Sequence, residues 1–215
     1  MKYILCWILM TCTVVAAEEL PRVLILGDTS YSEPSRSIAK ELKGSVEVVW
    51  KNPGDSSSAL AQFDTLIGSE SWDVIYFNFG LADLHYKDPK TTAIRAMSKS
   101  AGGVRVTSPE QYSKNLTEFV KRLKTTNAKL IWASTTPIRD SKFDDLYDPG
   151  SEIEYNAIAE KIMEECDVKI TDMHTYVLAN IGENKVADPF SFHRVLPLHS
   201  TMVESIFREL KRPEA

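Results

Sequence analysis

The chain has 215 residues, of which 43% are hydrophobic and 26% charged, with a formal net charge of −5. A chain of this length and composition can bury a sizeable core without disulfides or metals, so one globular domain is expected. The acidic balance and the lack of Lys or Arg runs argue against nucleic acid or an anionic membrane surface as the main partner.

The first residues have the pattern of an export signal. Lys2 supplies a positive n-region, residues 3–15 are almost wholly apolar, and Ala17 ends a small-residue cleavage pattern. We therefore predict a signal peptide at residues 1–17, a single domain at residues 18–215, and a periplasmic or secreted protein without membrane contact after cleavage. An uncleaved anchor is the alternative, although the apolar stretch is short for a bilayer span.

Cysteine usage excludes an internal disulfide in the mature chain. Cys6 and Cys12 fall in the leader, and Cys166 stands alone on an expected amphipathic helix, where a core role is more common than a nucleophilic one. Without a Cys pair or clustered His, we expect no structural zinc site, and we expect no other cofactor.

Strand-like and helix-like segments alternate along the mature chain. Short apolar runs predict strands at residues 22–26, 46–50, 72–77, 130–133 and 168–170. Apolar periodicity and capping residues predict helices near residues 34–42, 60–67, 108–123, 153–163 and 197–210. A long loop is expected at residues 80–107. This alternation predicts an α/β fold whose parallel sheet is covered on both faces, with the binding crevice beyond the carboxyl ends of the strands.

The first loop at that edge reads Gly27-Asp28-Thr29-Ser30. A hydroxyl placed where a strand turns into a helix is well positioned for nucleophilic attack. The alternative is that these side chains only cap a turn.

The residues that end the third strand carry a family resemblance. Residues 72–85 read W-D-V-I-Y-F-N-F-G-L-A-D-L-H, and residues 108–112, 128–137 and 155–159 fit the same pattern. Together they resemble the SGNH (GDSL-type) hydrolases, in particular an exported bacterial branch, over nearly the whole mature chain. The resemblance implies a flavodoxin-like three-layer fold with a five-stranded parallel sheet in the order 2-1-3-4-5, and hydrolysis of a small-molecule or glycan ester.

The family mechanism uses a Ser nucleophile, a His base, an Asp that orients it, and oxyanion donors from a Gly and an Asn. By the resemblance, the nucleophile position falls on Thr29 and the oxyanion Gly on Gly54. The position that holds Asn or His in the family falls on Ala82, between the cleft candidates Gly80 and Asp83. Thr29 keeps a hydroxyl, but its methyl group restricts χ1, and Ala82 has no donor.

The block before the last helix also departs from the family. The catalytic His of the usual D-x-x-H falls on Pro189, while Asp188 and His193 lie nearby with a different spacing. A local shift would let His193 act as base with Asp188 as its orienter. Glu33 stands where the branch holds Gly, beside the nucleophile loop.

Two functional interpretations remain open. The substitutions at Thr29, Ala82 and Pro189 favour an inactive or weakly active relative that binds an acylated glycan or similar ligand. The alternative is a working esterase that uses Thr29, His193 and Asp188. A nucleotide- or flavin-binding module is a weaker third interpretation, since the first loop lacks G-x-G-x-x-G or P-loop spacing.

Other polar residues carry weaker signals. His85 follows the third strand and either lines the cleft or lies on a surface loop. Asp172 and His174 follow the fifth strand, where a helix cap and a packing residue are expected, and His199 lies in the last helix. The acidic stretch at residues 144–148 has the donors for a cation, although a solvated loop is the simpler interpretation.

Overall fold

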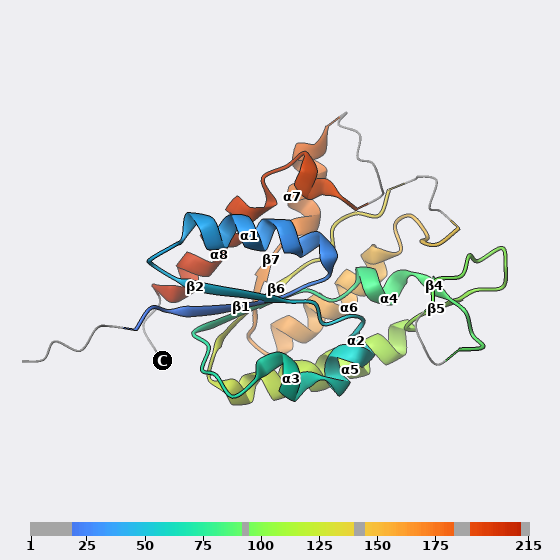
Figure 1. Cartoon of the computed structure of the whole chain (residues 1–215). Coiled ribbons are helices and arrows are strands. Elements are labelled where there is room, and N and C mark those ends of the chain that lie inside the picture. Colours follow the sequence, from blue (N-terminus) through green and yellow to red (C-terminus); the bar gives the residue numbers. More distant parts are fainter. Residues whose placement is uncertain (1–18, 92–94, 140–144, 183–189, 212–215) are drawn as a thin grey trace, which may run out of the picture.

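The computed structural model of the chain describes residues 19–91, 95–139, 145–182 and 190–211 (Figure 1). The expected leader at residues 1–17 lies outside the described residues, as do the candidates Asp188 and Pro189. In the described part of the chain, no helix combines the length and the apolar character needed to cross a bilayer.

A parallel sheet of five strands forms the centre of the molecule. Its strands are β1 (Arg22–Leu26), β2 (Glu47–Lys51), β3 (Val74–Phe77), β6 (Lys129–Ala133) and β7 (Lys169–Thr171). Their order is β2-β1-β3-β6-β7, which confirms the expected 2-1-3-4-5 arrangement. In register, Leu24 of β1 lies between Val49 of β2 and Ile75 of β3.

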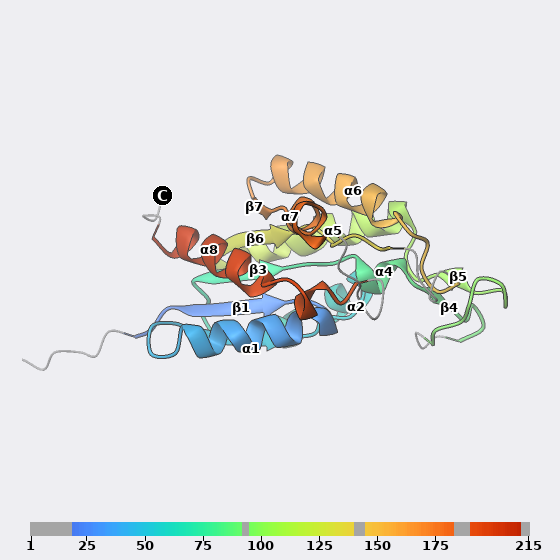
Figure 2. The ribbon, with the colours of Figure 1, turned by 90° about the horizontal axis from the view of Figure 1, so that it is seen from above.

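Helices cover both faces of this sheet (Figures 1 and 2). One face carries α1 (Ser32–Glu41), α7 (Met173–Ile181) and α8 (Leu198–Leu210). The other carries α2 (Ser56–Ala61), α3 (Phe63–Ile67), α5 (Pro109–Leu123) and α6 (Glu152–Glu165). Successive strand residues point to opposite faces, so Val23 and Ile25 join one core while Leu24 and Leu26 join the other. Both faces of the inner strands β1, β3 and β6 are buried, which explains their continuous apolar sequences, while the edge strands β2 and β7 are partly exposed.

Capping residues set where the helices begin. Ser108 accepts a hydrogen bond from the N–H of Gln111 and Pro109 follows at the first helical position of α5, as expected. Asp172 likewise caps α7 by accepting from the N–H of Thr175. The single helix expected near residues 60–67 is instead two short helices, α2 and α3, which meet at Gln62.

The segment expected as a long loop contains secondary structure. It holds α4 (Leu81–Leu84) and an antiparallel pair, β4 (Tyr86–Lys87) and β5 (Val104–Arg105). Strands of two residues leave almost no periodicity in the sequence, which is why the expectation of a loop was wrong. Short 3₁₀ turns complete the described structure: η1 (Thr29–Tyr31), η2 (Lys124–Thr126) and η3 (Phe192–Arg194).

Candidate functional site

Thr29 lies at the carboxyl edge of the sheet, as the resemblance implies. It opens the turn η1 directly after β1, and its side chain is exposed. The Asp28 carboxylate caps this turn by accepting a hydrogen bond of 2.7 Å from the N–H of Ser30. Burial raises the pKa of Asp28 above its ordinary value. Gly27 is required before it, since a Cβ there would lie 2.6 Å from the ring of Tyr31.

Gly54, the expected oxyanion donor, lies in the loop after β2 with a left-handed φ of 73°. Its N–H donates a hydrogen bond of 2.9 Å to Oδ1 of Asn52 in the same loop. Asp55 then caps α2 by accepting from the N–H groups of Ser57 and Ser58. The N–H of Gly54 is therefore committed to a side chain within its own turn.

The loop after β3 directs its polar groups inward. The amide of Asn78 is buried and donates to the carbonyl of Ala133 at 2.8 Å. Gly80 packs so closely on Thr135 that a Cβ would collide with that side chain. Ala82, half-buried in α4, presents only a methyl group.

Asp83 was expected beside the cleft, but its side chain is fully buried. Its carboxylate accepts hydrogen bonds from the N–H of Ser56 at 3.0 Å and from the hydroxyl of Ser56 at 2.6 Å. Asn115 donates to the same hydroxyl at 3.0 Å. Burial raises the pKa of Asp83 to about 6, although the hydrogen bonds from Ser56 oppose the shift. Asp83 therefore joins α4 to α2 and α5.

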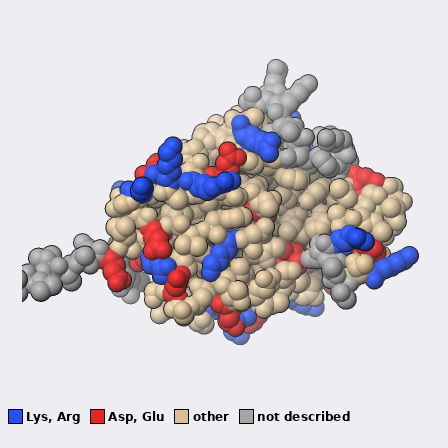
Figure 3. Space-filling model, in the orientation of Figure 1, with Lys and Arg blue, Asp and Glu red and all other residues tan. Residues whose placement is uncertain are grey.

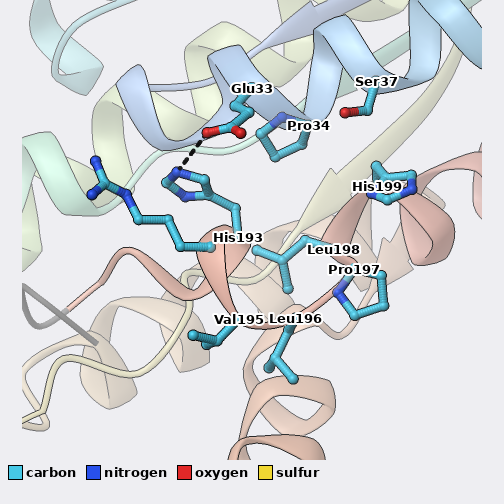
Figure 4. Close-up of a pocket in the computed structure, with 10 residues that line it drawn as sticks. Glu33, Pro34, Ser37, His193, Val195, Leu196, Pro197, Leu198 and His199 are labelled. Atoms are coloured by element: carbon cyan, nitrogen blue, oxygen red, sulfur yellow. Dashed lines mark ion pairs between the residues drawn. The ribbon is translucent and has the colours of Figure 1, made fainter. Parts of the chain in front are cut away.

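His193 lies in η3 next to the Thr29 loop, with 10% of its side chain exposed. Its Nε2 lies 3.4 Å from Oε2 of Glu33 in α1, an ion pair when the imidazole is protonated (Figure 4). Its charge also acts on the nearby carboxylate of Asp28, whose pKa it lowers against the larger effect of burial. The structure thus brings His193 to the loop that carries Thr29, with its Nε2 directed at Glu33. The hydrogen bonds of the described residues do not join Thr29 to His193.

The described aspartates of the acidic stretch hold the β4–β5 pair in place. Asp148 accepts from the hydroxyl of Tyr86 at 2.6 Å and pairs with Arg105 at 2.6 Å and with Lys99. Partial burial acts to raise the pKa of Asp148, but these three partners outweigh it and lower the pKa to about 2. Asp145 accepts from the N–H and hydroxyl of Ser100. Within the described ranges, no cluster of three or more His, Cys, Asp or Glu side chains has the arrangement of a metal site.

A row of aromatic side chains is formed by His85, Tyr147 and Phe190. The rings of Tyr147 and Phe190 meet edge to face with centroids 5.3 Å apart, and His85 lies 6.1 Å from Tyr147. Burial lowers the pKa of His85, which favours its neutral form. His85 is thus a half-buried member of an aromatic row.

An acid–imidazole pair that the sequence pattern did not predict lies after β6. Oε1 of Glu152, a buried residue at the start of α6, lies 3.2 Å from Nε2 of His174 in α7. The N–H of His174 also donates to the hydroxyl of Ser134 at 2.9 Å. Glu152 and His174 lie 22 positions apart in the sequence, so no local motif joins them. The one available signal was that Glu152 lies on the same side of α6 as the buried residues Tyr155 and Ala159.

Two hollows lie near these residues. A pocket of about 310 Å³ separates α1 from η3 and the start of α8, and Glu33, His193 and His199 contribute to its lining. A narrow crevice of about 10 Å³, beside Ser30, Tyr31 and Phe190, has room for roughly one water molecule. The larger space therefore lies beside the Thr29 loop, on the α1 and α8 side.

Comparison with known proteins identifies the fold. No model of a protein family matches the chain, and no curated protein matches it in sequence. A solved lipase/acylhydrolase from Enterococcus faecalis is 17% identical, with a TM-score of 0.66 over 91% of this chain and 100% of that one.

Two further solved structures give the same result. An acetyl xylan esterase from Geobacillus stearothermophilus is 15% identical, with a TM-score of 0.60 over 90% of this chain and 95% of that one. A GDSL-like lipase from Bacteroides thetaiotaomicron is 15% identical, with a TM-score of 0.60 over 87% and 88%. The chain therefore has the three-layer α/β fold of the SGNH (GDSL-type) hydrolases.

Proposed function

We propose that this chain is an SGNH-hydrolase relative that binds an acylated glycan or a similar ester and does not hydrolyse it at enzymatic rates. The structural likeness to esterases and lipases supports the hydrolase ancestry, and the named acetyl xylan esterase supports a carbohydrate ester as the ligand class. Loss of chemistry on a retained fold is reasonable, because function resides in particular side chains.

This proposal depends mainly on one observation: neither expected oxyanion donor is available in the structure. The N–H of Gly54 donates to Asn52, and Ala82 has no side-chain donor. The nearby Asn78 amide cannot take over, since it donates to the Ala133 carbonyl within the core. Removing one such donor from a working enzyme costs roughly 10²–10³ in rate. A site that lacks both donors stabilises the tetrahedral intermediate far less than a working site does.

The position of His193 adds a second argument. A general base must lie within hydrogen-bond reach of the hydroxyl that it deprotonates. The Nε2 of His193 lies instead 3.4 Å from Glu33, the residue that replaces the family's Gly. Thr29 therefore has a hydroxyl at the right place in the fold and no described base directed at it.

A working esterase is the second candidate, and the position of His193 also favours it. The imidazole is largely buried beside the Thr29 loop, close enough to influence the pKa of Asp28. Rotation about its side-chain torsions would redirect Nε2, because hydrogen bonds of catalytic groups often form fully only with substrate bound. In that case Thr29 would be the nucleophile, and Asp188 would orient His193.

Hydrolysis and binding assays separate the two candidates. The chain from Glu18 onward, together with Thr29→Ala and His193→Ala, is assayed with 4-nitrophenyl acetate, and binding of acetylated xylo-oligosaccharide is measured by calorimetry. We expect equal rates at the buffer background in all three proteins, with saturable binding by the unmodified chain. Turnover that disappears in both variants would establish the esterase instead, and a lack of binding would refute the ligand class.

We also propose that the chain is exported by its N-terminal segment. The basic, apolar and small-residue pattern of residues 1–17 supports this. Expression of the full chain in a bacterium should yield periplasmic or secreted protein whose first residue, by N-terminal sequencing, is Glu18. Uncleaved protein in the membrane fraction would indicate an anchor.

A further inference from the structure

The pocket between α1 and α8 has the size of a ligand site. Its volume of about 310 Å³ lies at the lower end of the range for small-molecule pockets, roughly 300–1,000 Å³. All of its lining residues come from α1 or from the continuous segment formed by η3 and the start of α8. Its lining does not include Thr29, so the pocket is separate from the Thr29 loop, although His193 lies beside both.

Polar groups lie toward the two ends of this pocket. Nε2 of His193 and Oε2 of Glu33 lie 3.4 Å apart at one end, and Ser37 and His199 lie toward the other (Figure 4). Glu33 and Ser37 are four residues apart on α1, which places them on one face of the helix, one turn from each other. The pocket therefore offers a carboxylate, a hydroxyl and two imidazoles, which together donate and accept hydrogen bonds.

Apolar side chains lie between these ends. Pro34 comes from α1, while Pro197 and Leu198 come from the opposite wall (Figure 4). Proline rings have little conformational freedom to lose, so a ligand that packs on them encounters a preorganised surface. An apolar middle with polar ends suits a ring whose faces are C–H groups and whose rim carries hydroxyls.

The charges of the lining favour a neutral ligand. Glu33 and Arg194 carry opposite charges, so the lining has no net charge while the histidines are neutral. An anion would face the carboxylate of Glu33, and a cation would face the guanidinium of Arg194. A neutral ligand avoids both penalties, because its hydroxyl groups can donate to Glu33 and accept from an imidazole.

We propose that this pocket is a subsite for one neutral sugar ring of the ligand, held by Glu33 and His193 at one end and by Ser37 and His199 at the other. The inference rests on the proposed carbohydrate-ester function and places the sugar on the α1 and α8 side of the Thr29 loop. The ester would then extend from the subsite past His193 toward Thr29.

The test is a titration of the ¹⁵N-labelled chain with xylobiose, followed by amide chemical shifts. Ser37→Ala and His199→Ala each remove one pocket hydrogen bond, and Ser200→Ala, an exposed serine outside the lining, is the matched control. We expect saturable shifts at residues 33–37 and 193–199. Each pocket variant should weaken affinity by about threefold to tenfold, with no change in the control.

Three results would overturn the subsite: shifts confined to the loops at the carboxyl edge, equal weakening by Ser200→Ala, or equally tight binding of cyclohexanol. These results are independent of hydrolysis. Turnover of 4-nitrophenyl acetate with xylobiose in the pocket would refute the non-hydrolytic function and leave the subsite intact. Binding at the carboxyl edge alone would refute only the subsite.

Discussion

At the scale of single residues, the buried carboxyl group of Asp83 should make the stability of the chain depend on pH. Its pKa of about 6 exceeds the ordinary 3.8, so the folded chain retains a proton that the unfolded chain has released. Stability should therefore fall as pH rises from about 4 to about 6, and a shift of two units corresponds to about 3 kcal/mol. The difference in unfolding free energy between the unmodified chain and Asp83→Asn should decrease by about that amount, measured by urea denaturation at pH 4 and pH 7.

Glu118→Gln is the control for this measurement, since Glu118 is an exposed carboxylate on α5. The unfolding free energy of Glu118→Gln should stay within about 0.5 kcal/mol of that of the unmodified chain across the same pH range. If the difference in unfolding free energy between the unmodified chain and Asp83→Asn is independent of pH, or grows as pH rises, burial does not raise the pKa of Asp83.

Thr29 offers a second prediction at this scale. Restoring the family nucleophile with Thr29→Ser removes one methyl group and supplies no oxyanion donor. Because each missing donor is worth roughly 10²–10³ in rate, we expect hydrolysis of 4-nitrophenyl acetate to stay within about threefold of the unmodified chain. An increase of thirtyfold or more would show that the methyl group alone had blocked a functional site.

The sequence predicts where single residues lie in the fold better than it predicts which residues they contact. Thr29, Gly54 and Ala82 do lie in the segments that follow β1, β2 and β3, at the carboxyl edge that the strand order fixes. The contact between Glu33 and His193 joins residues 160 positions apart and depends on how α1 meets η3. No local pattern encodes such a contact.

At the scale of elements, Asp148 joins the β4–β5 pair to the chain before α6. Tyr86 of β4, Arg105 of β5 and Lys99 between them all contact its carboxylate. Hydrogen bonds to charged groups contribute about 1.5–3 kcal/mol, so Asp148→Ala should destabilise this pair by an amount of that order. Hydrogen exchange at Tyr86 and Arg105 should accelerate accordingly.

Glu160→Ala, an exposed substitution on α6, serves as the control and should leave this exchange unchanged. The pKa of Asp148 lies near 2, so its contribution is complete above about pH 4 and is lost as pH falls toward 2. Unchanged exchange at Tyr86 in Asp148→Ala would show that the pair is held by other contacts.

Elements with long apolar patterns were predictable, and those with short ones were not. The inner strands β1, β3 and β6 carry continuous apolar runs, and helix α5 carries a clear helical periodicity. Helix α7 was anticipated only through the expected cap at Asp172, although Met173, Val177 and Ile181 repeat every four residues and are buried. The β4–β5 pair is stabilised by ion pairs with a distant segment, which local propensity does not reveal.

At the scale of the whole molecule, the sheet and its two cores provide a rigid support for the loops at one edge. The face seen in Figure 3 carries Lys, Arg, Asp and Glu side chains interspersed, with wide uncharged areas between them. Such a surface does not focus a field of one sign. This face therefore gives a polyanion no electrostatic advantage over the neutral sugar ester that we propose.

We propose that Thr29 is not an activated nucleophile, and a fluorophosphonate probe tests this without any choice of substrate. An activated hydroxyl displaces fluoride from the probe and retains the phosphonyl group, which intact-protein mass spectrometry detects. We predict that the chain from Glu18 onward shows no more labelling than Thr29→Ala after prolonged incubation. A stoichiometric adduct that peptide mapping places on Thr29, and that His193→Ala abolishes, would instead identify a working esterase.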